Sequence, residues 1–85
     1  MYIKFKETLI HEKLGDKIIL LYPDSGKFYE LNDSATFIFE KIINGKGKKY
    51  IVMNLANEFE CDETEAEKDF DKFIANIKEA GFVEE

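Results

Sequence analysis

The sequence contains one cysteine, one histidine, one proline and no tryptophan among its 85 residues. A lone cysteine excludes an intramolecular disulfide, which fits a protein of a reducing compartment. One histidine and one cysteine are also too few for a zinc site, which usually needs four ligands at characteristic spacings. We therefore expect no resident metal.

Long apolar runs and secretion signals are also missing. No apolar segment approaches the ~20 residues that a membrane-spanning helix needs. The opening residues 1–9 (MYIKFKETL) lack a long apolar core and a cleavage pattern. We therefore expect a cytoplasmic protein that does not contact a membrane.

Catalytic motifs are equally scarce. The sequence has no Ser-His-Asp set and no phosphate-binding glycine loop. Cys61 would need a base and an orienting partner to act as a nucleophile, and His11 is the only histidine available. The many carboxylates of residues 63–71 are more typical of a solvated helix face than of an acid–base pair. We therefore expect no catalytic residues and no cofactor, and a protein that is not an enzyme.

The charge balance bears on the choice of partner. The chain carries 12 Lys and Arg residues against 18 Asp and Glu, a formal net charge of −6. Affinity for phosphate backbones comes mainly from Lys and Arg, so this balance disfavours nucleic acid. Hydrophobic residues make up 45% of the chain, including eight Phe and four Tyr. That content suffices for a small core, and we expect one domain over residues 1–85.

The first third of the chain alternates as strands do. Residues 8–14 (TLIHEKL) and 16–23 (DKIILLYP) flank a plausible tight turn at Gly15-Asp16, and residues 27–32 (KFYELN) return after a second turn. Apolar residues on both faces of the second run indicate a central strand. We predict a three-stranded antiparallel meander. Residues 1–7 fit either an arm or an extra strand.

From Asn32 onward the apolar residues recur at helical spacing. The apolar positions of three predicted helices are Ala35, Ile38, Phe39, Ile42 and Ile43; Val52, Leu55, Ala56 and Phe59; and Ala66, Phe70, Phe73, Ile74 and Ile77. Asn32, Asp33 or Ser34 can cap the first helix and Asp62 the third. Residues 45–49 are predicted to be a flexible connection. The order predicts an α+β fold, a three-stranded antiparallel sheet followed by three helices, similar to a winged helix-turn-helix.

Residues 20–45 (LLYPDSGKFYELNDSATFIFEKIING) and 55–85 (LANEFECDETEAEKDFDKFIANIKEAGFVEE) carry a further pattern. An aliphatic strand runs into Pro23-Asp24, Leu31-Asn32 precedes a helix, and a late helix runs into Gly81-Phe82. In order and spacing this pattern resembles the PqqD-like family. Its members include the peptide chaperone of pyrroloquinoline quinone synthesis and the recognition elements of ribosomal peptide-modifying systems.

The resemblance implies a non-catalytic adaptor, a peptide chaperone in the biosynthesis of a ribosomally made, post-translationally modified peptide. Such a module binds the leader segment of a precursor peptide and presents it to a modifying enzyme or protease. A radical SAM protein, a lasso-type protease or a cyclase would be the enzyme partner. We expect a monomer or a weak dimer, because an unguarded strand edge can pair with itself.

The expected site is the edge of the third strand, and the resemblance implies that the third helix lies beside it. In strand addition, a guest backbone pairs with an exposed strand edge and its alternate side chains fill pockets. The predicted peptide-binding residues are Lys27, Phe28, Tyr29, Glu30 and Leu31 on the strand, and Asp69, Lys72, Phe73 and Asn76 on the third helix. Alternation puts Tyr29 and Leu31 on one face. Leu31 is assigned to the core, and the facing of Phe28 and Tyr29 stays open.

Two other functions remain. The order of elements permits a winged-helix DNA-binding regulator, whose recognition helix would carry the carboxylates of residues 63–71 toward a polyanion. The second is an assembly module that docks on an enzyme without binding a precursor. Binding to DNA tests the first, and capture of an enzyme without precursor tests the second.

Overall fold

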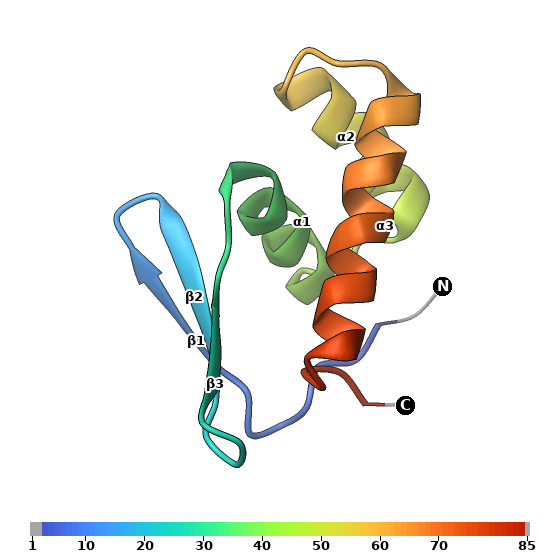
Figure 1. Ribbon diagram of the computed structural model, residues 1–85. Coiled ribbons are helices and arrows are strands. Elements are labelled where there is room, and N and C mark those ends of the chain that lie inside the picture. Colours follow the sequence, from blue (N-terminus) through green and yellow to red (C-terminus); the bar gives the residue numbers. More distant parts are fainter. Residues whose placement is uncertain (1–2, 85) are drawn as a thin grey trace.

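The computed structural model describes residues 3–84. Its elements are β1 (Ile10–Leu14), β2 (Lys17–Tyr22), β3 (Lys27–Glu30), α1 (Asp33–Ile43), α2 (Lys48–Glu58) and α3 (Glu63–Glu79). The strands form an antiparallel sheet in the order β1-β2-β3, with the helices on one side of it (Figure 1). The predicted α+β fold is confirmed, although the likeness to a winged helix-turn-helix is loose.

The central strand β2 has apolar residues on both faces, as its sequence predicts. Ile18 and Leu20 point toward the helices and are buried, whereas Leu21 points away from them and is exposed. The register places Leu21 between Ile10 of β1 and Phe28 of β3. Phe28 is 71% exposed, so this row of three side chains, the outer row, leaves apolar surface in solvent.

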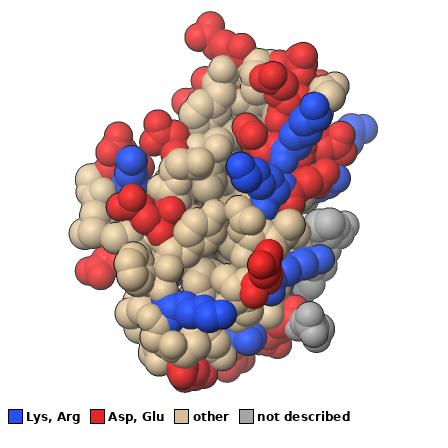
Figure 2. All heavy atoms as spheres, in the orientation of Figure 1, with Lys and Arg blue, Asp and Glu red and all other residues tan. Residues whose placement is uncertain are grey.

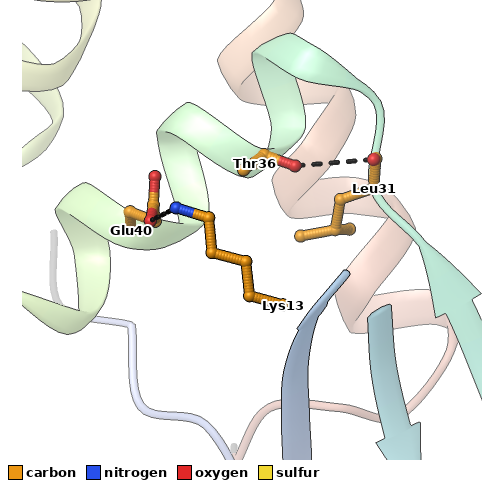
Figure 3. A network of polar contacts seen from close by, with 4 residues as sticks. All are labelled: Lys13, Leu31, Thr36 and Glu40. Carbon is orange, nitrogen blue, oxygen red and sulfur yellow. Dashed lines mark hydrogen bonds and ion pairs between the residues drawn. The ribbon is translucent and has the colours of Figure 1, made fainter. Parts of the chain in front are cut away.

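The sheet is tied to α1 where β3 ends. The Asn32 side chain caps α1 by accepting a hydrogen bond from the Ala35 N–H at 2.8 Å. The buried Thr36 hydroxyl donates to the Leu31 carbonyl at 3.4 Å, and Lys13 pairs with Glu40 at 3.7 Å (Figure 3). The cap and the Thr36 bond fix the angle at which the chain leaves the strand.

Helix α3 has a cap at its start and a glycine at its end. The Asp62 carboxylate accepts from the Glu65 N–H at 2.8 Å, so Asp62 caps the helix as predicted. At the other end Gly81 takes a φ of +80°, which favours glycine. The Phe82 N–H then donates to the Ile77 carbonyl at 3.0 Å, so the chain turns back and buries the Phe82 ring.

The second helix differs from its prediction at both ends. It begins at Lys48, so the predicted flexible connection 45–49 is shorter than expected. Phe59 is the residue at its C-terminal cap and stays 41% exposed, packing its ring edge on Phe37 at 6.0 Å. The helical spacing of apolar residues continues to Phe59, but the helix ends at Glu58, one residue earlier.

The N-terminal segment forms an arm. Phe5 is bridged to Val83, the Lys6 N–H donates to the Phe82 carbonyl at 3.1 Å, and the Glu84 N–H donates to the Lys4 carbonyl at 2.8 Å. Residues 3–9 therefore pass the C-terminal end of α3 rather than joining the sheet (Figure 1). Residues 1 and 2 of the predicted arm lie outside the described residues.

None of the helices found between residues 3 and 84 combines the length and apolar character needed to cross a bilayer.

Candidate functional site

The outer edge of β3 presents unpaired backbone groups. The Leu31 N–H donates to the Ile18 carbonyl at 2.8 Å, which fixes the phase of the ladder between β2 and β3. Backbone groups alternate between the two sides of an antiparallel strand, so Tyr29 also faces β2. The N–H and C=O groups of Phe28 and Glu30 therefore point away from the sheet.

No strand among residues 3–84 pairs with this edge of β3. The N-terminal arm does not cover this edge, because it pairs with Val83 and its neighbours instead. The same ladder argument applies to β1, where His11 and Lys13 point their backbone groups outward. Both edges of the sheet are thus open within the described chain. They differ in the side chains that lie beside them.

A groove runs between β3 and α3. It has a volume of about 280 Å³, and its lining residues are Tyr29, Asn32, Ser34, Ala35, Asp69, Lys72, Phe73 and Asn76. Pockets for small molecules usually hold about 300–1,000 Å³, so this groove suits one or two side chains better than a cofactor. Residues other than Lys, Arg, Asp and Glu cover much of the seam between β3 and α3, and both basic and acidic side chains lie over α3 nearby (Figure 2).

Tyr29 connects the two sides of the groove. Its ring packs on Phe82, with a centroid distance of 6.5 Å. Its hydroxyl accepts a hydrogen bond from Asn76 Nδ2 at 3.2 Å. Because Phe82 supports the ring and Asn76 holds the hydroxyl, the Tyr29 side chain is fixed toward α3, whereas its neighbour Phe28 faces solvent.

The structure brings most of the predicted site residues together. Tyr29, Asp69, Lys72, Phe73 and Asn76 line the groove, and Lys27, Phe28 and Glu30 lie along the adjoining strand. Phe73 is only 3% exposed, so it forms the floor of the groove and belongs to the core as well.

Leu31 does not belong to the open edge. Its side chain is fully buried, its N–H is bonded to Ile18, and its carbonyl accepts from Thr36. The assignment of Leu31 to the core is therefore confirmed, and its place among the exposed strand-edge residues is not supported.

Three groove residues were missed by the sequence reasoning: Asn32, Ser34 and Ala35. Asn32 has an evident local role as the cap of α1, and the Ser34 hydroxyl donates to the Asn32 side chain, so these local roles hide their second position on the groove. Their place immediately after the edge strand was the available signal, because a strand that feeds directly into a helix puts the first helical turn beside the strand end.

Cys61 and His11 show no catalytic arrangement. Burial raises the pKa of the Cys61 thiol, and the nearby carboxylates of Glu65, Asp69 and Asp62 raise it further. A thiol with a raised pKa is a poor nucleophile at neutral pH. His11 packs its ring against Phe39 at a centroid distance of 5.2 Å. Within residues 3–84, His, Cys, Asp and Glu side chains form no group of three or more that could hold a metal ion.

A second hollow, of about 480 Å³, lies between α2 and α3 and is more open. At its side Lys48 pairs with Asp71 at 3.1 Å and with Glu67 at 3.2 Å. Hydrogen bonds to these two carboxylates raise the pKa of Lys48. The cation is thus engaged by its own chain, and this hollow lacks a neighbouring strand edge.

The fold is shared with two solved structures. A lasso peptide synthetase B1 complexed with the leader peptide has a TM-score of 0.92 and 24% identity, and each chain is covered in full. TbiB1 in complex with the TbiA(beta) leader peptide has a TM-score of 0.88 and 21% identity, covering 95% of this chain and 94% of that one. At these identities the likeness is evidence for the fold.

Family membership comes from the sequence itself. No curated protein matches the chain. Residues 17–83, however, match the family model described as Coenzyme PQQ synthesis protein D (PqqD). The match includes β2, β3 and all three helices, and the resemblance found in the sequence is confirmed: the protein belongs to the PqqD family.

Proposed function

We propose that this protein is a non-catalytic adaptor that binds the leader segment of a ribosomally made precursor peptide and presents it for modification. The observation that carries the proposal is the open edge of β3 beside the groove on α3. The two solved structures of the same fold are complexes with leader peptides, and this supports the proposal.

In this proposal the leader lies along β3 as a fourth strand. Its backbone exchanges hydrogen bonds with the N–H and C=O groups of Phe28 and Glu30. These backbone hydrogen bonds form with almost any leader sequence. Leader side chains alternate in direction. Those on the Tyr29 side enter the groove, and those on the Phe28 side lie in the outer row. Asp69, Lys72, Phe73 and Asn76 contact the inward side chains.

The edge of β1 offers the same backbone groups without the groove. Backbone pairing alone gives little discrimination between guests, because every peptide carries the same N–H and C=O groups. Of the two open edges within residues 3–84, β3 is the one that borders the groove on α3. We therefore place the leader on β3.

The proposed second partner is the enzyme that acts on the captured precursor, a radical SAM protein, a lasso-type protease or a cyclase. The outer row of Ile10, Leu21 and Phe28 gains further side chains when a leader strand is added, since outward leader residues lie beside Phe28. Exposed apolar patches of this kind commonly mark protein interaction sites. In the free state the protein is expected to be a monomer or a weak dimer.

A binding titration tests the proposal directly. A fluorescently labelled leader peptide, taken from the precursor encoded beside this protein's gene, is expected to bind with a dissociation constant of about 1 μM or lower, after the cost of ordering a disordered chain. The readout is fluorescence anisotropy. If no leader encoded in the neighbourhood binds, the adaptor function is wrong.

Two controls separate the alternatives. A duplex DNA at low salt is expected to show no mobility shift, because the exposed residues of α3 include Glu63, Glu65 and Glu67. A pull-down with the neighbouring enzyme is expected to be strengthened by the leader. Equal capture with and without leader favours a pure assembly module instead.

A further inference from the structure

The groove between β3 and α3 is polar at the height of Tyr29. Its apolar contributors, Ala35 and Phe73, are buried, so they offer little of their surface to a guest. The remaining lining side chains carry a phenol, two amides, a hydroxyl, a carboxylate and an ammonium group. An apolar guest side chain would therefore cover polar atoms without pairing them.

The charges of the groove offset one another. Asp69 and Lys72 lie three residues apart on α3, on the same side of the helix, and both are exposed. A guest carboxylate attracted to Lys72 would be repelled by Asp69. A guest ammonium group attracted to Asp69 would be repelled by Lys72. Exposed pairs of this kind contribute little in either direction. Net charge therefore gives little selection at this point of the groove.

Hydrogen-bonding capacity remains as the basis for selection. Asn76 Nδ2 donates to the Tyr29 hydroxyl oxygen at 3.2 Å, in a partly buried position. Asn32 Oδ1 is already occupied by the Ala35 N–H at 2.8 Å and the Ser34 hydroxyl at 3.1 Å. The Tyr29–Asn76 pair still offers donors, the phenol O–H and the second N–H of Asn76, and it offers Asn76 Oδ1 as an acceptor. If the Asn76 amide is reversed, the phenol donates to Asn76 Oδ1, and the pair then offers the Asn76 NH₂ as donor and the phenol oxygen as acceptor.

A carboxamide is a guest group that can pair with a donor and an acceptor lying side by side. Its oxygen accepts and its NH₂ donates. A leader residue paired opposite Tyr29 points to the same side of the sheet as Tyr29, so its side chain meets this pair. We propose that the Tyr29–Asn76 pair selects a leader with Asn or Gln at the position opposite Tyr29. This inference rests on the proposed binding of a leader to β3.

The test uses synthetic leader peptides of the precursor encoded beside this protein's gene. Nuclear Overhauser contacts to the Tyr29 ring identify the leader position opposite it, and peptides with Asn, Gln, Leu or Glu at that position are titrated. The Asn and Gln peptides are expected to bind about tenfold more tightly than the Leu peptide, because Leu leaves partly buried polar groups unpaired. In the variant Asn76→Leu, of similar size, that preference is expected to fall to about twofold or less.

The outcomes are distinguishable. A wild-type preference for Leu or Glu, or an amide preference that persists in Asn76→Leu, overturns the inference while leaving strand addition intact. The variant Tyr29→Phe, which keeps the ring on Phe82 and removes the hydroxyl, is expected to reduce the amide preference as well. If none of the peptides binds to the wild-type protein, the proposed function itself fails, and this inference fails with it.

Discussion

Replacing Glu30 by proline is expected to weaken leader binding about 100-fold while leaving the domain folded. The Glu30 N–H points away from β2, so the free protein loses no ladder hydrogen bond in Glu30→Pro. The leader, in contrast, loses a hydrogen-bond donor and meets the proline ring where its own backbone should lie. An orphaned leader carbonyl costs about 1–3 kcal/mol, and 2.7 kcal/mol corresponds to about 100-fold.

The other edge of the sheet supplies a matched control. Lys13 of β1 also points its N–H outward, so Lys13→Pro is the same change on an open edge that does not line the groove between β3 and α3. It also breaks the exposed pair with Glu40, which contributes little. Both proline variants are measured by urea unfolding and by leader titration. Similar stabilities with a binding loss only in Glu30→Pro support the site on β3. Equal binding losses, or a loss only in Lys13→Pro, contradict it.

Truncating Phe82 is expected to lower the free energy of unfolding by about 3–4 kcal/mol. The ring is 1% exposed and packs edge-on against Tyr22 at 6.4 Å and beside Tyr29 at 6.5 Å. Phe82→Ala therefore leaves a cavity beneath the groove. Since small domains are stable by only about 5–15 kcal/mol, the loss is readily measured by urea unfolding.

Phe28→Ala is the matched control, because it makes the same chemical change on a side chain that is 71% exposed. A surface truncation of this kind is expected to alter stability by no more than about 0.5 kcal/mol. If Phe82→Ala costs no more than Phe28→Ala, the C-terminal segment is not packed beneath Tyr29. In leader titrations, Phe82→Leu is expected to bind more weakly than the wild-type protein, because Tyr29 loses the ring that supports it.

Much of the fold is encoded locally and could be predicted from the sequence. The helical spacing of Phe70, Phe73 and Ile77 places them in the core, and Asp62 caps the helix that carries them. The apolar residues on both faces of β2 identify it as the central strand. Each of these features depends on residues close together in the chain, so periodicity and capping chemistry suffice to predict them.

The site depends on contacts between distant segments, and sequence patterns do not contain them. Alternation puts Tyr29 and Phe28 on opposite faces, but which one faces α3 follows from how the sheet docks on the helices. The backbone groups of Phe28 and Glu30 point outward because the hydrogen bonds between β2 and β3 are made by the alternate residues, among them Leu31. The N-terminal arm is likewise fixed by pairing with Val83 at the far end of the chain.

Amide hydrogen exchange, resolved by residue, tests strand addition to β3 most directly. In the free protein the Phe28 and Glu30 amides are expected to exchange rapidly, because they point away from β2, as do those of His11 and Lys13 on β1. Saturating leader peptide is expected to slow exchange at Phe28 and Glu30 and to leave His11 and Lys13 unchanged. A leader that binds without slowing exchange at Phe28 and Glu30 contradicts strand addition to β3.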